Sequence, residues 1–206
     1  MAQNSFNTED NTLAQRVTIG LTKIGLALKS QSWQDASISN LSPTQGQILS
    51  LLRTRCSTGM RLSTVAQELA VTPATASDAV AALVEKGLVQ KTKAHDDRRA
   101  IAITLTPLGQ QQADQVLGWS DFLKVAVDGL SPEEQAVFLK GLIKIILKLQ
   151  EQGQIPTARM CVTCQYFRPN VYKDPNFPHH CAFVNAPFGD RQLQVDCPDH
   201  LPQPSR

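Results

Sequence analysis

The feature that most constrains this chain is a pair of short helical patterns separated by a proline. Residues 63–70 place apolar side chains on one helix face, and a second pattern starts at Thr72-Pro73 and stops at Gly87. Threonine caps a helix N-terminus, proline suits the first helical turn, and glycine ends a helix. Two short helices that meet at a tight turn form a helix-turn-helix, so the sequence predicts this motif over residues 63–87.

The second helix of the motif is expected to turn a face of small residues outward. Ala76, Val80 and Leu83 follow the spacing of one buried helix face. The opposite face carries side chains that are short enough for the N-terminal half of the helix to enter a DNA major groove. The candidate DNA-binding residues here are Thr72, Ala74, Thr75, Ser77 and Asp78.

A basic β-hairpin is predicted directly after this helix. Residues 88–93 and 101–105 alternate in the manner of half-buried strands, on either side of a charged stretch. Positions 86 to 99 contain five Lys or Arg residues and two Asp residues, whereas the whole chain has a net charge of only +2. A local patch of this kind attracts phosphates where the overall charge does not. The candidate DNA contacts in this wing are Lys91, Lys93, Arg98 and Arg99.

Further helices are expected on both sides of this unit. Apolar side chains recur at helical spacing, and Ser-Pro or Thr-Pro pairs supply caps with first-turn prolines. The expected helices run from about residue 13 to 28, from 42 to near 59, from 106 to about 127, and from 131 to about 149. The fold class is therefore mainly α with a small β-hairpin wing, followed by an irregular cysteine-rich C-terminal tail.

Residues 61–109 resemble the MarR family of winged-helix transcriptional regulators. Several parts agree in order: the helix-turn-helix, EKGLV at 85–89, DDRR at 96–99 and LTPLG at 105–109. The resemblance extends to about residues 12–152. It implies an obligate homodimer, held by its first and last helices, that binds a pseudo-palindromic operator in double-stranded DNA.

The resemblance also implies a function and a role for the wing. It implies a repressor whose DNA affinity depends on a signal, with a small-molecule effector as a further partner. Arg98 or Arg99 would enter the minor groove, oriented by Asp97, a role that suits the planar and permanently charged guanidinium. Many members have a basic or amide residue where this chain has Asp78, so the base preference does not carry over.

Composition sets the expected domains and the location. We expect a leader over residues 1–11, a MarR-like winged-helix domain with dimerisation helices over 12–152, with its DNA-binding core at about 42–109, and a tail over 156–206. The first twenty residues lack a basic start followed by an apolar run, and no apolar stretch is long enough for a bilayer span. These observations predict a soluble cytoplasmic protein without a membrane segment.

The tail contains four of the five cysteines and many prolines, with few aliphatic residues for a core. Such a segment needs a cross-link, and cytosolic thiols are reduced, so a metal is favoured over disulfides. Four thiolates suit both zinc and iron–sulfur clusters. Zinc is the expected cofactor and a [4Fe–4S] cluster the alternative. The candidate ligands are Cys161, Cys164, Cys181 and Cys197.

Several alternatives stay open at this stage. His180 or His200 could replace one cysteine ligand. We expect Phe167, Phe177, Phe183 and Phe188 to form a small core around the site. The tail could also sense iron or redox state, or serve as a docking module for another protein. A metalloenzyme is disfavoured because no His-Glu-x-x-His helix or phosphate-binding glycine loop accompanies the cysteines.

Overall fold

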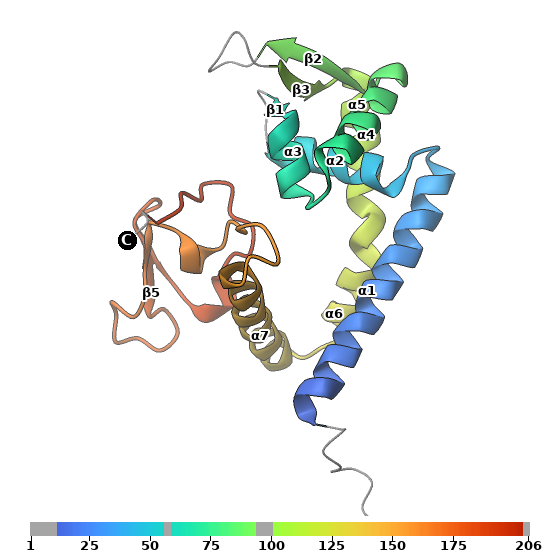
Figure 1. Ribbon diagram of the computed structural model, residues 1–206. Helices are drawn as coiled ribbons and strands as arrows, with labels where there is room; N and C mark the ends of the chain where they lie inside the picture. The colour runs from blue at the N-terminus through green and yellow to red at the C-terminus, as the bar shows by residue number, and fades with distance from the viewer. Residues whose placement is uncertain (1–11, 56–58, 94–100, 204–206) are drawn as a thin grey trace, which may run out of the picture. The chain divides into compact units, whose positions relative to one another are not determined.

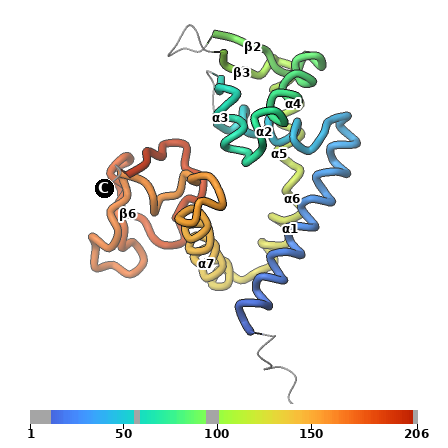
Figure 2. Tube along the Cα trace, viewed as in Figure 1, coloured from blue at the N-terminus to red at the C-terminus, as the bar shows by residue number. Residues whose placement is uncertain are grey.

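The computed structural model describes residues 12–55, 59–93 and 101–203. The chain forms two compact units, one up to Lys124 and the other from Val125 onward. Figure 1 shows the helices and strands of both units, and Figure 2 follows the chain through them. Within the described ranges no helix has the length and apolar character needed to cross a lipid bilayer.

The first unit combines helices with a small antiparallel sheet. The strands pair in the order β1-β3-β2, and Lys91 lies opposite Ile103. Helix α6 (Asp121–Asp128) spans the boundary between the units. The other described elements are α1 (Leu13–Ile38), α2 (Pro43–Arg55), β1 (Met60–Arg61), α3 (Leu62–Glu68), α4 (Pro73–Glu85), β2 (Val89–Lys93), β3 (Ile101–Leu105), α5 (Pro107–Leu117) and the 3-10 turn η2 (Gly118–Ser120).

Capping side chains start the helices where the sequence predicts them. Thr72 accepts a hydrogen bond from the backbone N–H of Thr75 at 3.1 Å, and Thr106 accepts one from Gly109 at 3.0 Å. Ser42 and Gln45 form reciprocal cap hydrogen bonds at the start of α2. Each cap satisfies a backbone donor that the helix itself leaves unpaired.

The core of the first unit lies where α2, α4, α5 and the sheet meet. The predicted inner face of α4 is confirmed, since Ala76, Val80 and Leu83 are at most 1% exposed. Val80 and Leu83 pack in one core cluster with Ile48 and Ile103, among others. Burial of a whole apolar face against neighbouring elements is the main term that holds a short helix in place.

The second unit contains one long helix and the tail. Its elements are α7 (Pro132–Glu151), η3 (Cys161–Thr163), β4 (Phe167–Arg168), β5 (His179–Cys181), β6 (Ala186–Phe188) and η4 (Asp190–Gln192). The three short strands form an antiparallel sheet in the order β4-β5-β6. Helix α7 contacts η4, where Arg191 pairs with Glu133 at 3.0 Å and Asp190 with Lys140 at 3.6 Å. The compact units divide after Lys124, and the tail expected over residues 156–206 lies within the second unit.

Several boundaries and elements differ from the sequence prediction. Helix α1 continues ten residues beyond the apolar pattern, to Ile38, and the chain then turns through Asn40 with a φ of 52°. The single helix expected up to Val127 is interrupted at η2, where Trp119 packs into the space that Gly46 leaves open. The strand β1 and the sheet of the tail were not predicted. Strands this short lack enough residues to show an alternating pattern.

A close crossing of two backbone segments joins the wing to the following helix. Thr106 donates its backbone N–H to the carbonyl of Leu88 at 3.1 Å, and its hydroxyl donates to the carbonyl of Gly87 at 2.7 Å. Gly109 lies against this point, and a Cβ there would overlap the Leu88 carbonyl oxygen. The glycine is required because no side chain fits between the two segments.

Gly109→Ala should therefore destabilise the protein. The overlapping atom belongs to the backbone and cannot rotate away, so we expect the free energy of unfolding to fall by about 2 kcal/mol. Thermal denaturation followed by circular dichroism measures this change. Gly118→Ala is the matched control, since its nearest contact is an ordinary one at 3.4 Å. Equal stability of the two variants would contradict the close crossing.

Candidate functional site

The outer face of α4 has the exposure that DNA contact requires. Thr72, Ala74, Thr75, Ser77 and Asp78 are all exposed. The hydroxyls of Thr72 and Thr75 lie 2.8 Å apart and share a hydrogen bond, so the cap also orients the first exposed turn. Helix α4 thus presents a continuous face of short side chains, starting at its N-terminus.

Strand β2 adds positive charge beside this helix. Lys91 and Lys93 are both exposed, and their spacing of two places them on the same side of the strand. Helix α4 and β2 also contact each other within the unit. Arg98, Arg99 and Asp97 lie outside the described residues.

Lys86, which is also exposed, binds the start of α2. Its ammonium group donates to the backbone carbonyl of Asn40 and, at 3.0 Å, to the side-chain oxygen of Gln45. Gln45 is itself buried. Lys86 therefore joins the end of α4 to the start of α2.

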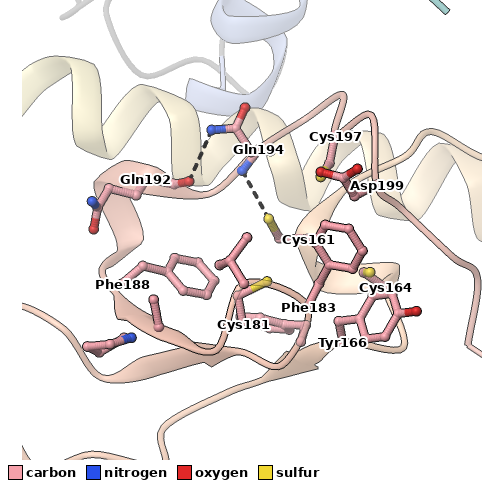
Figure 3. Close-up of a pocket in the computed structure, with 14 residues that line it drawn as sticks. Cys161, Cys164, Tyr166, Cys181, Phe183, Phe188, Gln192, Gln194, Cys197 and Asp199 are labelled. Atoms are coloured by element: carbon pink, nitrogen blue, oxygen red, sulfur yellow. Dashed lines mark hydrogen bonds between the residues drawn. The ribbon is translucent and has the colours of Figure 1, made fainter.

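The second candidate site is a cavity in the tail. All four predicted cysteine ligands line one cavity of about 330 Å³ (Figure 3). Cys161 and Cys164 flank η3, Cys181 ends β5, and Cys197 comes from the C-terminal segment. The structure thus brings together three parts of the chain that are separated by sixteen and fifteen residues in the sequence.

The walls of this cavity are mainly apolar. Tyr166, Phe167, Phe183 and Phe188 line it, and Tyr166 packs against Phe183 with ring centroids 5.4 Å apart. Phe177, expected in the same cluster, is 45% exposed and is not among the lining residues. Asp199 and Gln194 also line the cavity and were not singled out from the sequence, because only folding of the C-terminal segment brings them there.

Backbone hydrogen bonds fix the positions of the cysteines. Cys161 donates its N–H to the carbonyl of Gln194 at 3.0 Å, and Gln194 donates its N–H to Sγ of Cys161 at 3.3 Å. Cys197 donates its backbone N–H to the carbonyl of Arg159 at 2.8 Å. Burial is the largest influence on the Cys161 thiol and raises its pKa, and the other three thiols add to this effect. The four cysteines are free and form no disulfide.

The tail histidines are engaged elsewhere. Nε2 of His200 lies 3.0 Å from the hydroxyl of Thr163, and burial lowers the pKa of His200. Nδ1 of His180 lies 2.9 Å from the hydroxyl of Tyr172. Neither histidine is among the described residues that line the cavity. The arrangement therefore offers four sulfur ligands and no imidazole.

His179 has a supporting position. It is buried, and its Nε2 lies 2.8 Å from Oδ1 of Asp190, while Nδ1 accepts the backbone N–H of Asn170 at 3.2 Å. The hydrogen bond with His179 lowers the pKa of Asp190, and Lys140 lowers it further. This network ties β5, which ends at Cys181, to η4.

Residues 41–101 match the model of the MarR family. A comparison with curated proteins finds no match. The matched segment runs from the start of α2 into β3, so the helix-turn-helix and the wing carry the MarR pattern.

Several solved structures share the fold of this chain. FabT of Streptococcus pneumoniae in complex with DNA is 24% identical, with a TM-score of 0.58 over 68% of this chain and 99% of that one. MepR of Staphylococcus aureus in complex with DNA is 22% identical, with a TM-score of 0.57 over 64% and 97%. CouR of Rhodococcus jostii RHA1 bound to p-coumaroyl-CoA is 19% identical, with a TM-score of 0.55 over 71% and 96%. The chain therefore has the MarR winged-helix fold, and at least 29% of it lies outside each of these matches.

Asp190→Asn should destabilise the tail in a pH-dependent manner. A carboxylate whose pKa is lowered by folding stabilises the protein above its ordinary pKa, and this stability is lost as the pH falls through the lowered pKa. Because Asp190 is half-exposed, we expect a loss of about 1 kcal/mol at pH 7.

The measurement is the melting temperature of the full chain between pH 7 and about pH 3. Wild type and Asp190→Asn should differ at neutral pH and converge in acid. Glu151→Gln, which removes an exposed pair with Lys148, is the control and should change little. A difference that persists at the lowest pH would contradict the ionic role of Asp190.

Proposed function

We propose that this protein is a DNA-binding transcriptional regulator of the MarR type, and not an enzyme. The observation that carries the proposal is the exposed face of α4. This face has short side chains and begins at the capped N-terminus of the helix, and Lys91 and Lys93 lie on the neighbouring strand β2. A helix of this kind reads base edges in the major groove, and lysines beside it neutralise phosphates. Arg98 and Arg99 are proposed to add minor-groove contacts.

Homodimerisation is the second part of the proposal. Helix α1 has 26 residues, of which Ala36 is the buried one. Seven of its large apolar side chains are exposed, and an apolar surface of this extent on one helix favours a protein partner. They include Leu13, Val17, Ile19, Ile24, Leu26, Trp33 and Ile38. A second copy of the chain is the partner we propose, which would pair two α4 helices for a pseudo-palindromic operator.

The sign of regulation and the signal complete the proposal. We propose a cytoplasmic repressor whose DNA affinity changes with a bound small molecule or with the state of the tail. CouR, which shares the fold, has been solved with p-coumaroyl-CoA bound. An effector changes the affinity for DNA if it binds more tightly to a dimer with one spacing of the two recognition helices than to a dimer with another spacing.

The tail is proposed to hold a metal centre through Cys161, Cys164, Cys181 and Cys197. Their convergence on one cavity supports this proposal. Zinc, the cofactor expected from the sequence, and a [4Fe–4S] cluster both bind four thiolates. A catalytic zinc site keeps one position open to water and uses fewer protein ligands, so four cysteines favour a structural or sensing centre.

Selection of bound sequences from a random duplex library tests the regulator. Pseudo-palindromic sequences with half-sites about one helical turn apart are expected. Sedimentation of the free protein should give the mass of two chains. A monomer that binds every sequence with equal affinity would contradict the proposal.

Lys91→Ala and Lys93→Ala should each weaken binding to all sequences and reduce its salt dependence. Loss of one phosphate contact lowers the slope of log affinity against log salt by about 1. Fluorescence anisotropy with the selected operator at several salt concentrations measures this slope. Lys148→Ala, a lysine of α7 outside the winged helix, is the control. An unchanged slope in both wing variants would exclude β2 from the DNA contact.

A further inference from the structure

The cavity in the tail is larger than a single metal ion requires. About 330 Å³ is the space of roughly ten water molecules at about 30 Å³ each. Zinc bound by four thiolates sits at about 2.3 Å from each sulfur, which places the sulfurs about 3.8 Å apart with no free volume between them. The tail instead keeps its cysteines around the wall of an open space.

The spacing of the ligands leads to the same conclusion. In the part of the chain that the structure describes, no three His, Cys, Asp or Glu side chains lie close enough to hold one metal ion. Yet all four cysteines line the same cavity, from different sides of it (Figure 3). A cluster contains several metal atoms, so it can bind cysteines that lie on different sides of one cavity.

We propose that this cavity holds a [4Fe–4S] cluster, with Cys161, Cys164, Cys181 and Cys197 each bound to one iron. Such a cluster needs four cysteines and fills the space between them with four irons and four sulfides. The inference rests on the proposed metal centre of the tail and names its chemistry. It is independent of whether α4 binds DNA.

The surroundings of the thiols suit a cluster. Aromatic and aliphatic side chains form most of the wall, and an apolar shell of this kind limits the access of water to the metal. The backbone N–H of Gln194 donates to Sγ of Cys161 at 3.3 Å. Hydrogen bonds to the sulfurs are one of the means by which proteins tune iron–sulfur clusters.

The hairpin between β5 and β6 closes one side of this cavity. Phe183 and Val184 lie in its turn and line the cavity, and both are more than half exposed on their outer side. Tyr166 packs against Phe183 from β4's side of the site. Phe183 is therefore the side chain whose removal would open the cavity to solvent with the least effect on the cysteines.

The test is metal and sulfide analysis of the full-length protein, purified without oxygen and after incubation with ferrous iron and sulfide. About four irons and four acid-labile sulfides per chain, with a broad absorption near about 400 nm, are expected. About one zinc per chain with no sulfide, or a chain that takes up no iron, would overturn the cluster.

Variants locate the cluster. Cys161→Ser, Cys181→Ser and Cys197→Ser should lose most of the iron and the absorption. Cys56→Ser, His180→Ala and His200→Ala should keep both. Retention of iron in the three cysteine variants, or its loss in a histidine variant, would overturn the ligand set.

A further variant tests the site even if the cysteine variants fail to fold. Phe183→Ala should retain the cluster without oxygen but lose iron to a ferrous chelator several-fold faster than wild type. Phe177→Ala, an aromatic residue of the same tail outside the cavity, should match wild type. Equal rates in the two variants would contradict a cluster behind Phe183.

Operator binding by the iron-free protein separates the two proposals. Binding without iron supports the regulator whatever the tail holds. A protein that binds four irons but no operator supports the cluster and contradicts the proposed regulator.

Discussion

The first unit depends on the crossing between residues 87–88 and residues 106–109. At this point the end of α4, the start of β2 and the start of α5 are joined by hydrogen bonds from Thr106 and by the close approach of Gly109 to the Leu88 backbone. The crossing fixes the exit of α4 relative to the wing strand. The face of short side chains and the two exposed lysines therefore keep one arrangement, which a helix and a hairpin connected only by a flexible loop would not.

In the tail, contacts outside the cysteine side chains hold the segments that carry the cysteines. Backbone hydrogen bonds hold Cys161 and Cys197, a bridge pairs Cys164 with Pro202, and the His179–Asp190 network holds the strand that ends at Cys181. These bonds satisfy the polar backbone of a segment with few aliphatic residues. The four cysteines line a mainly apolar cavity and form no disulfide.

Most of the winged helix could be predicted because its signals are local. Threonine and serine caps, first-turn prolines and the spacing of Ala76, Val80 and Leu83 act within one or two turns of helix. The prediction was wrong where a distant contact decides the local structure. The break at η2 depends on the packing of Trp119 against Gly46. The hydrogen bonds of Lys86 are made with Asn40 and Gln45, which are more than forty residues away. None of these partners is visible in a local pattern.

The sequence by itself determined the helix-turn-helix, the two wing strands, the residues on the outer face of α4 and the set of cysteines that face one cavity. Residue type and short-range spacing suffice for these features, since capping and periodicity are local properties. Tertiary structure alone decided that the four cysteines line one cavity, that Phe183 and not Phe177 lines it, and that His180 and His200 bind other partners. Distances between segments arise from the packing and hydrogen bonding of the whole tail. For that reason, sequence left zinc and an iron–sulfur cluster open, and the cluster that we propose rests on the cavity that the folded tail forms around the cysteines.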